Sequence, residues 1–167
     1  MKVVMDSDCL IKLTKAKAKG DVTECVVVSI PEIVKKETVD EGKASGYADP
    51  LEIEKNIEAG KIMVKPVHMT SEIRGTAETL RLKGGEVDVY GLFRKGGFTA
   101  VASDDQKLIR KLEEIEVPCI TPTALIIYAW RKSAISRERA LRLLEQIKPM
   151  VSDEEYVLSK IEVEKER

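Results

Sequence analysis

Five short apolar runs along the chain predict the strands of a buried parallel sheet. They show little alternation between apolar and polar positions, as is typical of strands covered on both faces. Stretches with apolar residues at helical spacing lie between them, so strands and helices alternate. The expected strands cover residues 2–6, 25–30, 61–67, 98–103 and 117–121, and Pro66 marks the third as an edge strand.

Helical spacing, glycines and prolines divide the rest of the chain. Residues 42–50 are expected to form a loop because they hold two glycines and a proline. After Pro122 the chain becomes wholly helical, and residues 162–167 are expected to be frayed. The expected helices cover residues 7–19, 31–41, 51–58, 71–83, 86–93, 108–115, 124–132, 136–147 and 152–161.

The length of 167 residues fits about one domain. The order of elements predicts an α/β fold with a parallel sheet. We expect residues 1–130 to form the main domain and residues 131–167 to form a helical extension that packs on the same domain.

Composition narrows the function classes. Hydrophobic residues make up 43% of the chain but aromatic residues only 4%, which disfavours nucleic-acid binding through stacked aromatic rings. The 28 basic and 29 acidic residues give a net charge of −1, which excludes a histone-like binder but not an enzyme that acts on nucleic acid. The three cysteines have neither zinc spacing nor a disulfide framework. Neither a signal peptide nor a membrane span is recognisable, so we expect a cytoplasmic protein with no membrane partner.

Carboxylates follow two of the predicted strands. Asp6 and Asp8 come directly after the first strand, and Asp104 and Asp105 come after the strand that ends near Ser103. The carboxyl ends of parallel strands meet at one edge of a sheet, which is where the sites of such folds lie. Each acid has a structural alternative, since Asp8, Asp104 and Asp105 are also suited to cap the helices that follow them.

Three further acids lie on the predicted helices near this edge. Glu37 is on the helix after the second strand, and Glu86 and Asp88 open the helix after Gly84 and Gly85. Alone, Glu37 reads as a surface charge, and the other two could merely complement the helix dipole. Clustered carboxylates repel one another unless a cation neutralises them, and hard cations such as Mg²⁺ and Mn²⁺ prefer oxygen ligands. The set suits metal-assisted hydrolysis of a phosphodiester. Four lysines near this edge could contact phosphates, but each is better explained as a solvated surface charge: Lys12, Lys35, Lys36 and Lys107.

Read in order, these motifs resemble the PIN-domain ribonucleases, especially the toxin nucleases of prokaryotic toxin–antitoxin pairs. The resemblance covers about residues 1–130, and the remaining helices look like the C-terminal extension of one prokaryotic branch. The matching segments are residues 3–8 with Leu10 and Ile11, residues 30–37, residues 85–88, residues 102–105 and residues 117–121.

The resemblance implies a three-layer α/β/α sandwich whose acids hold one or two Mg²⁺ or Mn²⁺ ions and activate water against an RNA phosphodiester. It also implies RNA as substrate, with an antitoxin and a second copy of the chain as candidate partners. By position, Asp6 matches the first acid and Glu37 the second. Either Glu86 or Asp88 matches the third. The last acid is matched best by Asp105, with Asp104 beside it, and the accessory residues are Ser103 and Asp8.

Two other functions fit part of the pattern. Asp6-Ser7-Asp8 after an apolar strand also resembles the nucleophile motif of haloacid-dehalogenase-type phosphatases, in which Asp6 would form an aspartyl-phosphate and Asp8 would act as acid and base. That interpretation leaves Glu37, Glu86 and Asp88 without roles. The third candidate is a catalytically silent PIN-like module whose acids bind a basic partner.

Overall fold

The computed structural model describes residues 1–44 and 49–165. Its core is a sheet of five parallel strands in the order β3-β2-β1-β4-β5. The strands are β1 (Lys2–Met5), β2 (Val27–Pro31), β3 (Ile62–Lys65), β4 (Ala100–Ala102) and β5 (Cys119–Ile120). The expected α/β fold with a parallel sheet is confirmed, and β3, which ends just before Pro66, is an edge strand.

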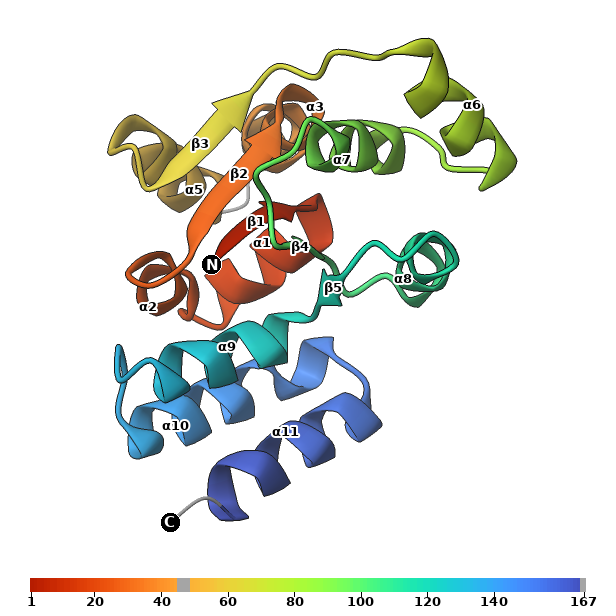
Figure 1. The fold of residues 1–167 in the computed structure, drawn as a ribbon. Coiled ribbons are helices and arrows are strands. Elements are labelled where there is room, and N and C mark those ends of the chain that lie inside the picture. Colours follow the sequence, from red (N-terminus) through yellow and green to blue (C-terminus); the bar gives the residue numbers. More distant parts are fainter. Residues whose placement is uncertain (45–48, 166–167) are drawn as a thin grey trace.

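Helices cover both faces of the sheet (Figure 1). Because crossovers between parallel strands are right-handed, the chain places helices on one face as it moves from β1 to β3 and on the opposite face as it moves from β4 to β5. α1 and α5 contact each other on the first face, and α7 contacts β1, β2 and β4 on the second. These helices are α1 (Ser7–Lys15), α2 (Lys19–Thr23), α3 (Glu32–Lys35), η1 (Lys36–Glu41), α4 (Gly42–Ala44), α5 (Asp49–Glu58), α6 (Ser71–Thr79), α7 (Gly85–Arg94) and α8 (Gln106–Glu113).

The central strand is buried on both faces, which explains its uninterrupted apolar sequence. Val3, Val4 and Met5 are almost completely inaccessible to solvent. A strand that alternated apolar and polar residues would place charges against one of the two helical layers. β1 therefore has to end before the first polar side chain, and it does so at Asp6.

The C-terminal helices pack on the same core as the sheet. They are α9 (Pro122–Arg131), α10 (Arg137–Ile147), the short 3₁₀ turn η2 (Lys148–Met150) and α11 (Asp153–Lys165). Figure 1 shows α9, α10 and α11 stacked beside one another, and α9 and α10 also contact α1. Arg139 of α10 makes an ion pair of 2.9 Å with Asp21 of α2. The domain boundary at residue 130 stays a prediction, since the two parts share one hydrophobic cluster.

Three expectations about helix ends are wrong. The helix expected over 7–19 ends at Lys15, and a separate helix, α2, runs through Gly20 after Lys17 adopts a positive φ of 55°. In the expected loop 42–50, residues 42–44 are helical and residues 49–50 open α5, whereas residues 45–48 lie outside the described part of the chain. Residues 162–165 belong to α11 and are not frayed, and residues 166–167 are not described.

The second crossover contains a π-helical segment that no sequence pattern indicated. α3, η1 and α4 follow one another without a break, and Pro31 caps the start of α3 with an extended backbone. The hydroxyl of Thr38 donates to the carbonyl of Val34 at 2.7 Å inside this helix. π-Helical turns are rare and frequently mark functional sites. This one contains Glu37.

None of the helices in the described ranges 1–44 and 49–165 is long and apolar enough to cross a membrane.

Candidate active site

The sheet reverses its direction of growth between β1 and β4. The chain adds β2 and β3 on one side of β1 and then returns to add β4 and β5 on the other. The helices that leave β1 and β4 diverge to opposite faces and open a crevice at the carboxyl edge, where ligands of such sheets bind. The backbone N–H of Asp6 donates to the carbonyl of Ala102 at 3.0 Å, which places the segments after β1 and β4 side by side.

Asp6 is a buried carboxylate that caps α1. Its Oδ1 accepts the N–H of Cys9 at 2.8 Å, and the residue is 9% exposed. Burial raises the pKa of Asp6 to about 6. Hydrogen bonds from Ser103 and Cys9 oppose this rise, and the charges of Asp8 and Asp105 add to it. The hydrogen bonds therefore compensate only part of the cost of burying an ionised Asp6, and a cation would stabilise it further.

Ser103 and Asp105 approach Asp6 from the end of β4. Ser103 is completely buried, hydrogen-bonds to Asp6, and accepts the N–H of Asp105 at 3.1 Å. Asp105 also caps α8, since its Oδ1 accepts the N–H groups of Lys107 and Leu108 at 2.8 and 3.3 Å. Asp105 therefore caps α8, as the structural alternative predicted, and it also lies near Asp6.

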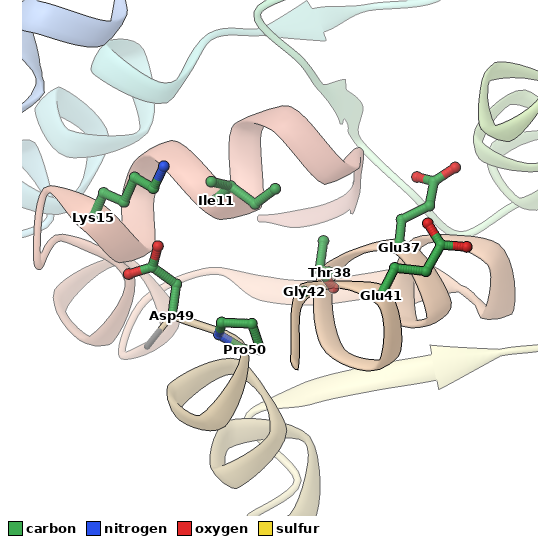
Figure 2. A pocket seen from close by; sticks show the side chains of 8 residues that line it. All are labelled: Ile11, Lys15, Glu37, Thr38, Glu41, Gly42, Asp49 and Pro50. Carbon is green, nitrogen blue, oxygen red and sulfur yellow. The ribbon is translucent and has the colours of Figure 1, made fainter. Parts of the chain in front are cut away.

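Glu37 reaches the same edge from the π-helical segment. The hydroxyl of Ser7 donates a short hydrogen bond to Oε2 of Glu37. Gly85, the first residue of α7, lies so close that a Cβ there would be 3.4 Å from Oε1 of Glu37. Figure 2 shows Glu37 and Glu41 at one end of a neighbouring cavity of about 370 Å³ and Lys15 and Asp49 at the other.

These side chains surround a recess of about 210 Å³, here called the active hollow. It brings together five of the acids that the sequence indicated, and one of its lining residues in the described part of the chain is basic. Its lining residues are Asp6, Ser7, Asp8, Val34, Glu37, Lys83, Gly85, Glu86, Val89, Asp105 and Leu108.

Glu86 and Asp88 occupy different recesses. Glu86 lines the active hollow, where its Oε2 accepts the backbone N–H of Lys83 at 2.9 Å and lies 3.1 Å from Nζ of Lys111. Asp88 lines a second recess of about 540 Å³ together with Lys35. Burial, and then the charge of Glu37, raise the pKa of Asp88. Of the two candidates for the third acid, the geometry favours Glu86.

Asp104 lies outside the active hollow, in a network that links β4 to the C-terminal helices. Lys12 makes a short ion pair with Asp104 and a second one, of 2.7 Å, with Asp8. Glu155 of α11 hydrogen-bonds to Asp104 and accepts the hydroxyl of Thr123 at 2.6 Å. Burial raises the pKa of Asp104 to about 6 and Glu155 adds to the rise, whereas Lys12 opposes it. The geometry therefore favours Asp105 over Asp104 as the last acid.

Sequence reasoning missed the partners that hold these acids. From the sequence, Ser7 is only part of a motif, Lys12 is a solvated charge and Glu155 has no assigned role in the site. The N–H of Glu155 donates to the hydroxyl of Ser152 at 3.1 Å, and its carboxylate contacts Thr123 and Asp104. The pair of Asp8 and Lys12 has the spacing of neighbours on a helix and could have been predicted. No local signal could have revealed the other contacts, because each joins residues far apart in the sequence.

The side chains around the hollow supply the carboxylate oxygens that Mg²⁺ and Mn²⁺ prefer as ligands, and the acidic side chains outnumber the basic ones. Within residues 1–44 and 49–165, however, no three acidic, histidine or cysteine side chains already lie close enough to form a metal site. The residue types therefore fit a hard cation, and binding one would draw the carboxylates further together.

Comparison with models of protein families gives a match over most of the chain. A family model described as a PIN domain matches residues 2–162, which include all five strands, every residue that lines the active hollow and most of α11. No curated protein matches the chain.

Proposed function

The chain belongs to the PIN-domain family, whose members are generally nucleases, and on this premise we propose that it is an endoribonuclease that depends on Mg²⁺ or Mn²⁺. The observation that carries the proposal is the active hollow at the reversal point of the sheet, where five carboxylates face a recess with one lysine.

The proposed ligands of the cation are Asp6, Glu86 and Asp105, with Glu37 across the hollow. They come from four different elements, and each is held by a hydrogen bond or a helix cap. When bound, a divalent cation would lower the pKa of a coordinated water and neutralise charge on the phosphodiester. The burial of Asp6 limits access of bulk water to this end of the site.

The buried Ser103 supports this arrangement because it fixes the position of Asp6. Its hydroxyl hydrogen-bonds to Asp6 and at the same time accepts the N–H of Asp105. One small side chain thus sets the separation of two proposed ligands. An alanine at position 103 would remove both contacts.

The phosphatase alternative loses support from the family match and from Asp8. An acid–base partner of Asp6 needs a carboxylate free to exchange protons, but Asp8 is paired with Lys12 at 2.7 Å. The other alternative is a catalytically silent binding module, and an activity assay distinguishes it from a nuclease.

The test is cleavage of a single-stranded RNA by purified protein. We expect cleavage with Mg²⁺ or Mn²⁺, none in excess EDTA, and none by Asp6→Asn with either metal. Mn²⁺ should also raise the melting temperature of the wild type, because a ligand that binds only the folded state stabilises it. Undiminished cleavage by Asp6→Asn, or by the wild type in EDTA, would exclude the proposed mechanism. A protein that binds Mn²⁺ but cleaves no RNA would instead be the silent module.

The narrower proposal, that the nuclease is the toxin of a toxin–antitoxin pair, rests on the family resemblance. Expression of the wild-type chain in a bacterial host should then arrest growth, whereas expression of Asp6→Asn at the same level should not. Equal growth with both chains would contradict the toxin proposal and leave the nuclease proposal intact.

A further inference from the structure

Lys83 is the one basic residue among the described residues that line the active hollow. Its backbone N–H donates to Oε2 of Glu86 at 2.9 Å, which fixes residue 83 beside the start of α7. Its side chain is exposed and makes no ion pair with any residue in the ranges 1–44 and 49–165. A lysine next to five carboxylates that pairs with none of them is available to another anion.

The other lysines beside the hollow are already engaged. Lys12 binds Asp8 and Asp104, and Lys111 binds Glu86 as well as the carbonyl of Arg81, at 3.1 Å in both cases. These two side chains hold the acids in place, and they are half-buried. Lys83 differs from both because nothing in the described protein fixes its ammonium group.

A second lysine of the same kind lines the neighbouring recess. Lys35 is half-buried and lines the recess of about 540 Å³ with Asp88, again without an ion pair in the described part of the chain. This recess adjoins the active hollow, since a Cβ at Gly85, which lines the hollow, would lie 3.8 Å from Ile33, which lines the second recess. Lys36, by contrast, lies 3.9 Å from Glu41.

A polyanion that enters the active hollow has to approach five carboxylates. Bound cations offset part of that repulsion at the reacting phosphate, but the protein itself must attract the strand. With only 4% aromatic residues the chain offers little base stacking, so contacts to the backbone phosphates have to supply most of the affinity. A lysine suits this task because its ammonium is a mobile point charge on a flexible stem.

We propose that Lys83 binds the phosphate that is cleaved and that Lys35 binds a neighbouring phosphate of the same RNA strand, which runs across Glu37 from one recess to the other. This inference rests on the proposed function, and it assigns two substrate-binding residues and a path for the strand across the site. Neither side chain makes an ion pair or a hydrogen bond within residues 1–44 and 49–165, so both should be replaceable without loss of the fold.

The test measures RNA binding separately from cleavage. In an Asp6→Asn background, which keeps the α1 cap, the affinity for a fluorescent single-stranded oligoribonucleotide is measured across a salt series. Each phosphate contact on a single strand contributes about 0.7 to the slope of log K against log salt. We expect Lys83→Gln and Lys35→Gln each to reduce the slope by about 0.7 and the double variant by about 1.4.

Lys95→Gln is the matched control. Lys95 follows α7 at the end opposite Gly85, is exposed, and makes no ion pair in the described chain. It should leave the slope unchanged. In the otherwise wild-type enzyme, Lys83→Gln should lower kcat/KM at least tenfold, Lys83→Arg should restore part of the loss, and Lys35→Gln should act mainly on KM.

The outcomes separate this inference from the proposed function. If the wild type cleaves RNA and Lys83→Gln and Lys35→Gln behave like Lys95→Gln, the lysine assignment is wrong and the nuclease proposal stands. If the wild type neither binds nor cleaves RNA with metal present, the proposed function fails and the assignment fails with it. If only one of the two lysine variants reduces the slope of log K against log salt, the proposed path of the strand between Lys83 and Lys35 is wrong.

Discussion

The hydroxyl of Ser7 donates a hydrogen bond to the carboxylate of Glu37, thirty residues further along the chain. This contact ties the first turn of α1 to the π-helical segment. It joins two elements that each contribute an acid to the active hollow, and it orients Glu37 toward Gly85.

Replacing Ser7 by alanine should therefore release Glu37. We expect Ser7→Ala to reduce kcat about tenfold or more and to lower the free energy of unfolding by roughly 1–2 kcal/mol, the usual cost of losing a hydrogen bond to a charged group. Steady-state kinetics and urea denaturation measure the two effects. Ser7→Thr keeps the hydroxyl and should recover most of the activity; no recovery would mean that the hydrogen bond is not what matters.

The raised pKa of Asp6 predicts how stability depends on pH. A carboxyl whose pKa is about 6 in the folded state and near 3.8 in the unfolded state favours folding when protonated. Its contribution is fully present below pH 3.8 and is lost as the pH rises to about 6. The loss amounts to roughly 3 kcal/mol, since each pKa unit is worth about 1.4 kcal/mol.

Asp6→Asn isolates this effect because asparagine also caps helices well. Without metal, the variant should be more stable than the wild type at pH 8 and lose that advantage toward pH 4. The measurement is denaturant unfolding of both proteins at several pH values in EDTA. Parallel pH profiles for the two proteins would show that Asp6 does not carry the predicted penalty.

Gly85 should tolerate a methyl group but nothing much larger. Its backbone has a normal helical conformation, and a Cβ would make an ordinary contact of 3.4 Å with Glu37. Gly85→Ala should keep most of the activity. Gly85→Leu should lower activity at least tenfold because its side chain enters the active hollow, while the melting temperature stays close to that of Gly85→Ala. Equal activity in both variants would contradict a close approach of α7 to Glu37.

Removing Lys12 should destabilise the fold in a pH-dependent way. Lys12→Met retains the apolar stem but leaves the carboxylate of Asp104, which is 7% exposed, without its cation. We expect a loss of roughly 2 kcal/mol at pH 8. The loss should shrink as the pH falls toward about 6, because Lys12 opposes the rise in the pKa of Asp104 and the variant therefore protonates Asp104 at a higher pH than the wild type does. Lys107→Met, at an exposed position on α8, is the control and should change stability by less than about 0.5 kcal/mol.

Much of the fold was predictable because the buried strands are nearly uniform in character. The run at residues 3–5 is apolar without alternation, and the sheet places it centrally with both faces covered. The run at residues 26–28 also leads into a strand, although Val27 is 42% exposed. The sequence could not predict α2 or the π-helical segment. α2 contains Gly20, which usually ends a helix, and a π-helix differs from an α-helix only in its hydrogen-bond register.

The candidate site was also predictable only in part. Position after a strand correctly brought Asp6 and Asp105 to one edge, since this follows from a parallel sheet alone. The choice between Glu86 and Asp88 could not be made, because residues two apart on a helix face nearly opposite directions and only the packing of α7 decides which one turns inward. The ligand roles of these acids remain predictions.

The strand order also governs when the active hollow can form during synthesis. β1 is made first but pairs with β4, whose residues are added about a hundred positions later. A chain emerging from the ribosome at its N-terminus can pair β1 with β2 early, yet it cannot bring Asp6 next to Asp105 until β4 and the start of α8 have emerged. On the proposed function, a nascent chain therefore lacks the complete active hollow, and with it the proposed nuclease activity, until that point of translation.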